Sequence, residues 1–96
     1  MLKTRVIGVL LVRDGIVVQS IGFRRYLPVG VPAIAVEYLN RWGIDEIAVL
    51  DIAARAAGRR PDAAGIAAYA RHAQVPLAVG GGIADVHDIE RIIRSG

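Results

Sequence analysis

Residues 6–12 have the sequence VIGVLLV, and residues 47–50 have the sequence IAVL. Both segments are continuously apolar, whereas a strand with one solvated face would alternate apolar and polar residues. Strands that are apolar on both faces are typical of parallel sheets, which other elements cover on both sides. We therefore predict β-strands over Arg5–Val12, Glu46–Asp51 and Pro76–Gly80.

A tight turn follows the first predicted strand. Asp14 and Gly15 form a dipeptide that favours two-residue hairpin turns, because both residues tolerate a positive φ. The apolar residues after it, Ile16–Val18, are expected to return as a short hairpin arm.

Three amphipathic segments predict helices between and after the strands. The first follows Pro32, the second begins near Asp62 and the third begins near Asp85. The stripe of the second helix is almost entirely alanine, so this helix must pack very close to the sheet. The residues expected to face the core are Ile34, Tyr38, Leu39 and Trp42; Ala63, Ile66, Ala67, Ala70 and Ala73; and Val86, Ile89, Ile92 and Ile93.

The alternation of strand and helix predicts βα units and a parallel sheet. Three helices can cover one face of three strands, but these strands are apolar on both faces and are too few to close into a barrel. We therefore expect an incomplete (βα)8 barrel, whose uncovered sheet face requires the rest of a larger barrel or self-association with further copies. The alternative is a small doubly wound domain with an apolar free face. Residues 1–96 are expected to form one partial barrel domain, with no second domain.

Composition argues against several classes of function. The 96 residues contain 12 Lys plus Arg, 9 Asp plus Glu and no Cys, which gives a net charge of +3. This charge is weak evidence for nucleic-acid binding, and the lack of Cys excludes thiolate metal sites and favours a reducing compartment. The apolar run at 6–12 is far shorter than the roughly 20 residues that span a bilayer. We expect a cytoplasmic protein that binds neither nucleic acid nor a membrane.

The tripeptide Gly80-Gly81-Gly82 lies between the third predicted strand and the third predicted helix. Glycines at the carboxyl end of a strand let the backbone approach a ligand closely, and the start of the next helix adds N–H groups that favour phosphate. The spacing matches neither a dinucleotide fingerprint nor a nucleotide P-loop. A phosphate site and a plain flexible turn are equal alternatives at this point.

Charged side chains gather at both ends of the predicted sheet. Asp51 ends the second strand and can serve as an acid, a base or a ligand anchor, or can hold a neighbouring loop. At the opposite end, adjacent strands can bring Arg5 and Glu46 together as an ion pair. His72 and His87 lie on separate helices without a second spaced ligand, which favours surface positions over a metal site. The arginines that follow strands, and suit either an anionic substrate or loop solubility, are Arg13, Arg24, Arg25, Arg55, Arg59 and Arg60.

Several segments together resemble the cyclase subunit of imidazole glycerol phosphate synthase. They are MLKTRVI at 1–7, the turn at 14–18, GIDE at 43–46, LDI at 50–52 and PLAVGGGI at 76–83. The similarity covers residues 1–96 without an obvious gap. That family folds as a (βα)8 barrel, which usually takes about 250 residues. The resemblance therefore implies that this chain corresponds to the first three βα units of such a barrel.

The resemblance also implies a reaction and a partner. The family takes ammonia from a glutaminase subunit docked at the bottom of the barrel. It converts a bisphosphorylated ribulosyl aminoimidazole carboxamide nucleotide into imidazole glycerol phosphate and an aminoimidazole ribonucleotide. By this similarity the backbone at Gly81 and Gly82 would bind a terminal phosphate. Arg5 and Glu46 would belong to the ammonia gate, and Asp51 would lie at the catalytic face; no cofactor or metal is implied.

Two positions depart from the family pattern. The acid/base aspartate expected on the first strand is Leu11, which cannot transfer a proton, and the substrate-contacting lysine expected in the next loop is Gln19. A retained gate with a lost acid resembles the paralogues found with surface-polysaccharide genes, in which the barrel and its glutaminase supply ammonia for amidinating a sugar. The alternatives are a true cyclase of histidine biosynthesis and a catalytically silent half-barrel that assembles with other copies.

Overall fold

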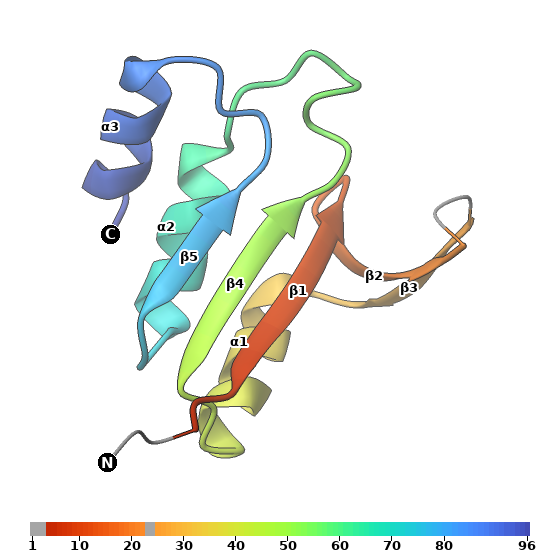
Figure 1. Ribbon diagram of the computed structural model, residues 1–96, viewed down its shortest axis with the longest axis vertical. Helices are drawn as coiled ribbons and strands as arrows, with labels where there is room; N and C mark the ends of the chain where they lie inside the picture. The colour runs from red at the N-terminus through yellow and green to blue at the C-terminus, as the bar shows by residue number, and fades with distance from the viewer. Residues whose placement is uncertain (1–3, 23–24) are drawn as a thin grey trace.

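A computed structural model describes residues 4–22 and 25–96 as one five-stranded sheet with three helices (Figure 1). None of the helices in these ranges is long and apolar enough to cross a membrane. The elements are β1 (Ile7–Arg13), β2 (Ile16–Ile21), β3 (Arg25–Gly30), α1 (Pro32–Arg41), β4 (Glu46–Asp51), α2 (Ala63–His72), β5 (Leu77–Gly80) and α3 (Val86–Arg94).

The sheet has the strand order β3-β2-β1-β4-β5. The strands β1, β4 and β5 are parallel, and α1 and α2 provide the crossovers between them. This is the predicted α/β architecture, and it corresponds to the N-terminal βα units of a (βα)8 barrel. The predicted bounds of β4 are confirmed, whereas β1 and β5 each begin later than predicted.

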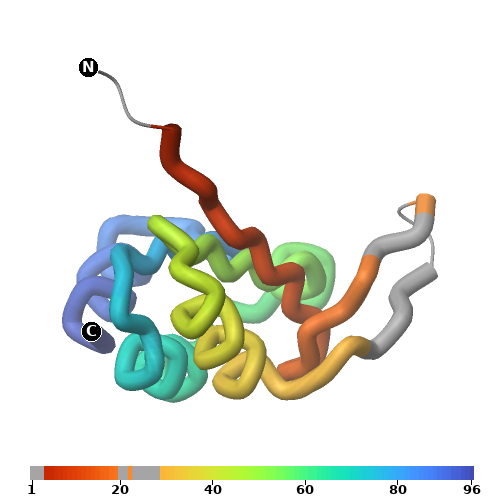
Figure 2. Tube along the Cα trace, turned by 90° about the horizontal axis from the view of Figure 1, so that it is seen from below, coloured from red at the N-terminus to blue at the C-terminus, as the bar shows by residue number. Residues whose placement is uncertain are grey.

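One face of the sheet holds the core. In Figures 1 and 2, α1 and α2 lie side by side along this face. The fully buried side chains Val36 of α1 and Ile47 of β4 meet there. On the opposite face Ile7, Val9 and Leu50 are 54%, 55% and 38% exposed, and no described element covers them. The expected apolar free face is therefore present, and a doubly wound arrangement is absent from the described residues.

The hairpin after β1 is longer than predicted. Asp14 and Gly15 both have positive φ, as the turn prediction requires, but β2 extends to Ile21 and pairs with a further antiparallel strand, β3. Sequence analysis missed β3, because Pro28 lies within it and proline argues against a strand. A proline is compatible with an edge strand, which is the position of β3 in the sheet.

The prediction of the buried face of α1 is wrong at three positions. Ile34, Tyr38 and Trp42 are exposed, whereas Val36 is fully buried and Leu39 packs against the core. The helix begins at Pro32, shortly after β3, and its residues Pro32 and Val36 are the buried ones. The exposed stripe instead lines an apolar groove of about 450 Å³ between α1 and the end of β3.

The apolar stripe predicted on α3 is also largely exposed. Val86, Ile89 and Ile93 are exposed, and only Ile92 of the four predicted residues is partly buried. The reason is the position of α3, which lies beside α2 beyond β5, the last strand of the sheet (Figure 1). The alanine stripe of α2 is confirmed, with Ile66 buried and its alanines partly buried.

The uncovered sheet face makes a prediction about residues 1–96 expressed alone. We expect them to bind an apolar fluorescent dye and to self-associate with rising concentration in size-exclusion chromatography, because exposed apolar patches drive association. The variant Val9→Glu places a charge on this face and should lower both signals without loss of helix content by circular dichroism. A dye-free monomer at all concentrations would contradict the prediction.

Candidate functional site

The loops that follow β4 and β5 form a groove at the carboxyl ends of the parallel strands. The groove has a volume of about 510 Å³ and brings together three of the predicted arginines with one of the predicted phosphate-binding glycines. Arg13 ends β1, Arg25 begins β3, and Arg24 lies outside the described residues. The lining residues are Arg55, Gly58, Arg59, Arg60, Gly82, Ile83 and Ala84.

The glycine turn after β5 packs tightly on the loop after β4. Gly81 and Gly82 have φ values of +109° and +74°. A Cβ atom on Gly81 would meet the carbonyl oxygen of Asp51, and one on Gly82 would lie 2.6 Å from the carbonyl oxygen of Arg59. These contacts alone require glycine. Within the described residues no hydrogen bond from the amides of Gly82 and Ile83 is present, and both residues line the groove.

A buried carboxylate connects the two loops. Asp88 of α3 is 3% exposed, and it accepts hydrogen bonds from the amides of Ala84 (2.8 Å) and Asp85 (3.3 Å) and from the guanidinium of Arg60. Arg60 also lies 3.3 Å from the carboxylate of Asp85, which caps α3 through the amide of Asp88. We refer to Arg60, Asp85 and Asp88 as the loop clasp.

The charged groups of the loop clasp shift one another's pKa values. The amide of Ala84 and the guanidinium of Arg60 hold the pKa of Asp88 below its usual value despite the cost of burial. The hydrogen bond and the charge of Asp88, together with Asp85, raise the pKa of Arg60. Sequence analysis missed this clasp, although two acidic residues three positions apart at a helix start are the signature of a capping box.

Asp51 holds the loop after β4. Its carboxylate accepts hydrogen bonds from the amides of Ala53 and Ala54, both at 3.1 Å, and from Arg59 at 3.2 Å. Asp51 pairs in register with the buried Val12, so it lies on the face of the sheet that the helices cover. Leu11 pairs with Leu50 and lies on the opposite, open face. These hydrogen bonds agree with the expectation that Asp51 can hold a neighbouring loop.

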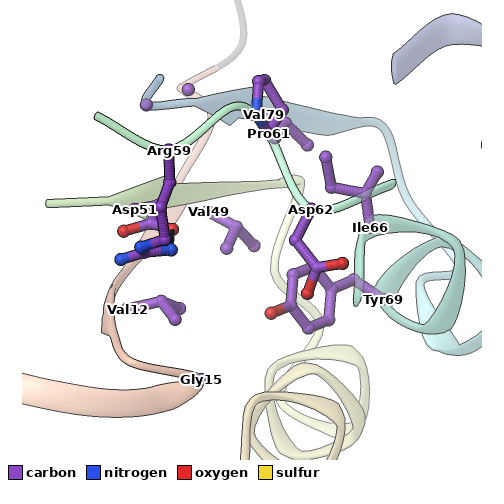
Figure 3. A pocket seen from close by; sticks show the side chains of 12 residues that line it. Val12, Gly15, Val49, Asp51, Arg59, Pro61, Asp62, Ile66, Tyr69 and Val79 are labelled. Carbon is purple, nitrogen blue, oxygen red and sulfur yellow. Dashed lines mark hydrogen bonds and ion pairs between the residues drawn. The ribbon is translucent and has the colours of Figure 1, made fainter. Parts of the chain in front are cut away.

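A small cavity lies beside Asp51, between the sheet and α2 (Figure 3). It measures about 60 Å³, and Arg59, Asp62 and Tyr69 supply polar groups to its lining. Burial raises the pKa of Tyr69, and the charges of Asp62 and Asp51 raise it further. The buried side chains of Val49 and Ile66 line this cavity and place it on the helix side of the sheet.

The opposite end of the open face carries the expected ion pair. A guanidinium nitrogen of Arg5 lies 3.3 Å from a carboxylate oxygen of Glu46, and Glu46 pairs in register with Ile7 of the open face. Between this pair and Arg13, which ends β1, the open-face positions of β1, β4 and β5 carry apolar side chains or glycine. They are Ile7, Val9, Leu11, Ala48, Leu50, Ala78 and Gly80.

Both histidines lie at the surface, as the sequence predicts. The side chain of His72 is 42% exposed, with Nδ1 3.7 Å from Glu37, and that of His87 is 88% exposed, with Nδ1 4.0 Å from Glu90. Across residues 4–22 and 25–96, no three His, Asp or Glu side chains are grouped so that they could hold a metal ion.

The sequence profile of the histidine biosynthesis protein family matches residues 5–96. The chain belongs to this family. The match begins at Arg5 of the ion pair and extends past the end of α3, so both the groove and the open face lie within the matched region. The resemblance described from the sequence motifs is therefore confirmed at the level of the family.

Relatives within the family have about 40% identity over nearly the whole chain. Imidazole glycerol phosphate synthase subunit HisF of Methanopyrus kandleri is 40% identical over 99% of this chain and 35% of its own length. The subunits HisF of Staphylococcus epidermidis and an Exiguobacterium species are 40% and 38% identical over all of this chain and 38% of their own lengths. The chain thus spans little more than a third of these relatives, at their N-terminal part.

The loop clasp predicts a pH-dependent contribution to stability. The variant Asp88→Asn should be less stable than the wild-type protein at neutral pH, because the charged hydrogen bond from Arg60 is lost. The native pKa of Asp88 is lowered, so its contribution is complete above the ordinary Asp value of about 3.9 and is lost as pH falls through the lower native value. Urea denaturation at a series of pH values should show the two proteins converging in acid. A constant difference would contradict this.

Proposed function

We propose that this chain supplies the first βα units of an ammonia-using barrel that binds a phosphorylated, anionic substrate and works with a glutaminase subunit. The observation that carries the proposal is the composition of the open face. Within the described residues, the Arg5–Glu46 pair lies at one end of this face, and the loops that form the groove of Arg55 and Gly82 lie at the other end of the sheet. The open-face positions of β4, of β5 and of β1 up to Leu11 carry apolar side chains or glycine beyond the pair.

The apolar stretch supports transport of ammonia rather than ammonium. A neutral molecule passes over the Val9, Leu11 and Leu50 side chains at low cost, whereas a charged ammonium ion would lose its hydration there. An ion pair at the entry can hold the path closed or let it open when a partner docks. Arg5 and Glu46 are 56% and 35% exposed and are therefore accessible to a docking subunit.

Leu11 is the residue that argues against a cyclase reaction in this protein. It lies on the open face beside Leu50 and Gly80, so no described carboxylate shares its level of the sheet. Without an acid/base group at this place, the ring-closing proton transfers lack their catalyst. We therefore propose that the ammonia serves a different acceptor, a sugar that is amidinated, as in the paralogues the sequence resembles. Because these metabolites are soluble, the proposed location is the cytoplasm.

A second candidate is the cyclase reaction of histidine biosynthesis itself. The names of the relatives support it, since these are imidazole glycerol phosphate synthase subunits. A third, favoured by the exposed Ile7 and Val9 on the open face, is a catalytically silent half-barrel that assembles with further copies. Imidazole product from the full-length protein would support the second candidate. Assembly with further copies, without transfer of nitrogen from glutamine, would support the third.

The cyclase assay provides the first test. The full-length protein that carries this chain, supplied with the ribulosyl nucleotide and ammonium, should form no imidazole product by chromatography. Leu11→Asp should raise product formation by on the order of 100-fold, because a positioned acid/base contributes about that much. Leu11→Asn is the matched control, since its amide has a similar shape and cannot transfer the proton. Wild-type turnover of about 1 s⁻¹ or more would refute the proposed loss of cyclase activity.

The gate provides the second test. In the complex with its glutaminase, Glu46→Gln should lower the yield of transferred nitrogen per glutamine hydrolysed, because the ion pair with Arg5 is broken. Transfer from added ammonium, which bypasses the glutaminase, should stay within about twofold of the wild type. Glu37→Gln on α1 removes the same charge away from the open face and serves as control. Equal losses from glutamine and from ammonium would contradict a gating role.

A further inference from the structure

We propose that Arg55 supplies the guanidinium that binds the phosphate of the substrate in the groove, while Arg59 and Arg60 hold the loops that form it. The inference rests on the proposed function and deepens it, because it names the residue that selects a phosphate monoester at this site. It follows from the partners of the three arginines that line the same groove.

Two of the three arginines already form ion pairs with carboxylates. Arg59 lies 3.2 Å from Asp51 and 3.7 Å from Asp14, and thereby connects the loop after β4 to the turn after β1. Arg60 belongs to the loop clasp, with Asp88 and Asp85 as its partners. These two guanidinium groups therefore face four carboxylates, and neither is free to neutralise a ligand.

Arg55 has no such partner. Within residues 4–22 and 25–96, no carboxylate forms an ion pair with its guanidinium, and no hydrogen bond from its side chain is present. It is exposed and lines the groove together with Gly82 and Ile83, whose amides also lack acceptors. Among the three groove arginines, Arg55 is therefore the one whose charge no described carboxylate compensates. An anion in the groove must rely on it for long-range attraction.

The backbone that carries Arg55 is held in place although its side chain is not. Ala54 is fully buried, and its carbonyl oxygen accepts a hydrogen bond from the amide of Arg59 at 2.8 Å. The carbonyl oxygen of Arg55 accepts one from the amide of Gly58 at 3.1 Å, which closes a tight turn. A fixed backbone with a free guanidinium suits a forked contact to two phosphate oxygens, because little backbone order is lost on binding.

The experiment measures binding of inorganic phosphate to the full-length protein that carries this chain, by calorimetry and by the amide shift of Gly82. Arg55→Ala should weaken the affinity by about tenfold or more, because charge-assisted hydrogen bonds are lost. Arg55→Lys keeps the charge without the fork and should bind with intermediate affinity. Arg71→Ala removes an equal charge from the far end of α2 and should change the affinity by less than about twofold.

The outcomes distinguish the proposed role of Arg55 from the proposed phosphate site. If the wild type and Arg55→Ala bind phosphate equally, the role of Arg55 is refuted and the phosphate site stands. If the wild type binds no phosphate, the proposed phosphate site fails and the role of Arg55 fails with it. An equal loss in Arg55→Ala and Arg71→Ala would show a general charge effect and would also refute the specific role. Thermal denaturation should be unchanged in Arg55→Ala, because its side chain holds no other group.

Discussion

The parallel strand β4 is the element on which the rest of the structure depends. It pairs with β1 on one side and β5 on the other, and its alternate residues Ile47 and Val49 are buried beneath the helices. This pairing sets the register of all three parallel strands, and thereby decides which residues lie under the helices and which lie on the open face. Because side chains alternate between faces, a slip of one residue would exchange the two sets.

Because of the same alternation, Asp51 and Leu11 lie on opposite faces of the sheet. Asp51 falls on the helix side, where it holds the loop after β4, and Leu11 falls on the open side beside Leu50. At the carboxyl ends, four carboxylates and two arginines keep the loops together around a glycine turn that cannot accept a side chain. The ion pairs that hold these loops together therefore neutralise two of the three arginines that line the groove, and one guanidinium charge is left for a ligand.

The proposed loss of cyclisation and the proposed gate are compatible with one another in physical terms. Moving neutral ammonia requires an apolar path and a closable entry, whereas ring closure requires a proton donor and acceptor within reach of the substrate. In the proposal, Val9, Leu11 and Leu50 of the open face form the path, and the ion pair of Arg5 and Glu46 forms the entry. A leucine at position 11 offers no proton donor or acceptor, but it is compatible with an apolar path.

Continuous apolar runs, the turn at Asp14-Gly15 and the alternation of strand and helix determined the class of fold, the parallel strands and the apolar free face. Those signals are local, so one chain of 96 residues was enough to show them. The rotation of α1, the exposed stripe of α3 and the existence of β3 were decided only by the tertiary structure, because they depend on which neighbours lie beneath each element. The same holds for the arginines at the groove. Sequence alone placed them at one end of the sheet, but which guanidinium is paired depends on distances between loops that are far apart along the chain.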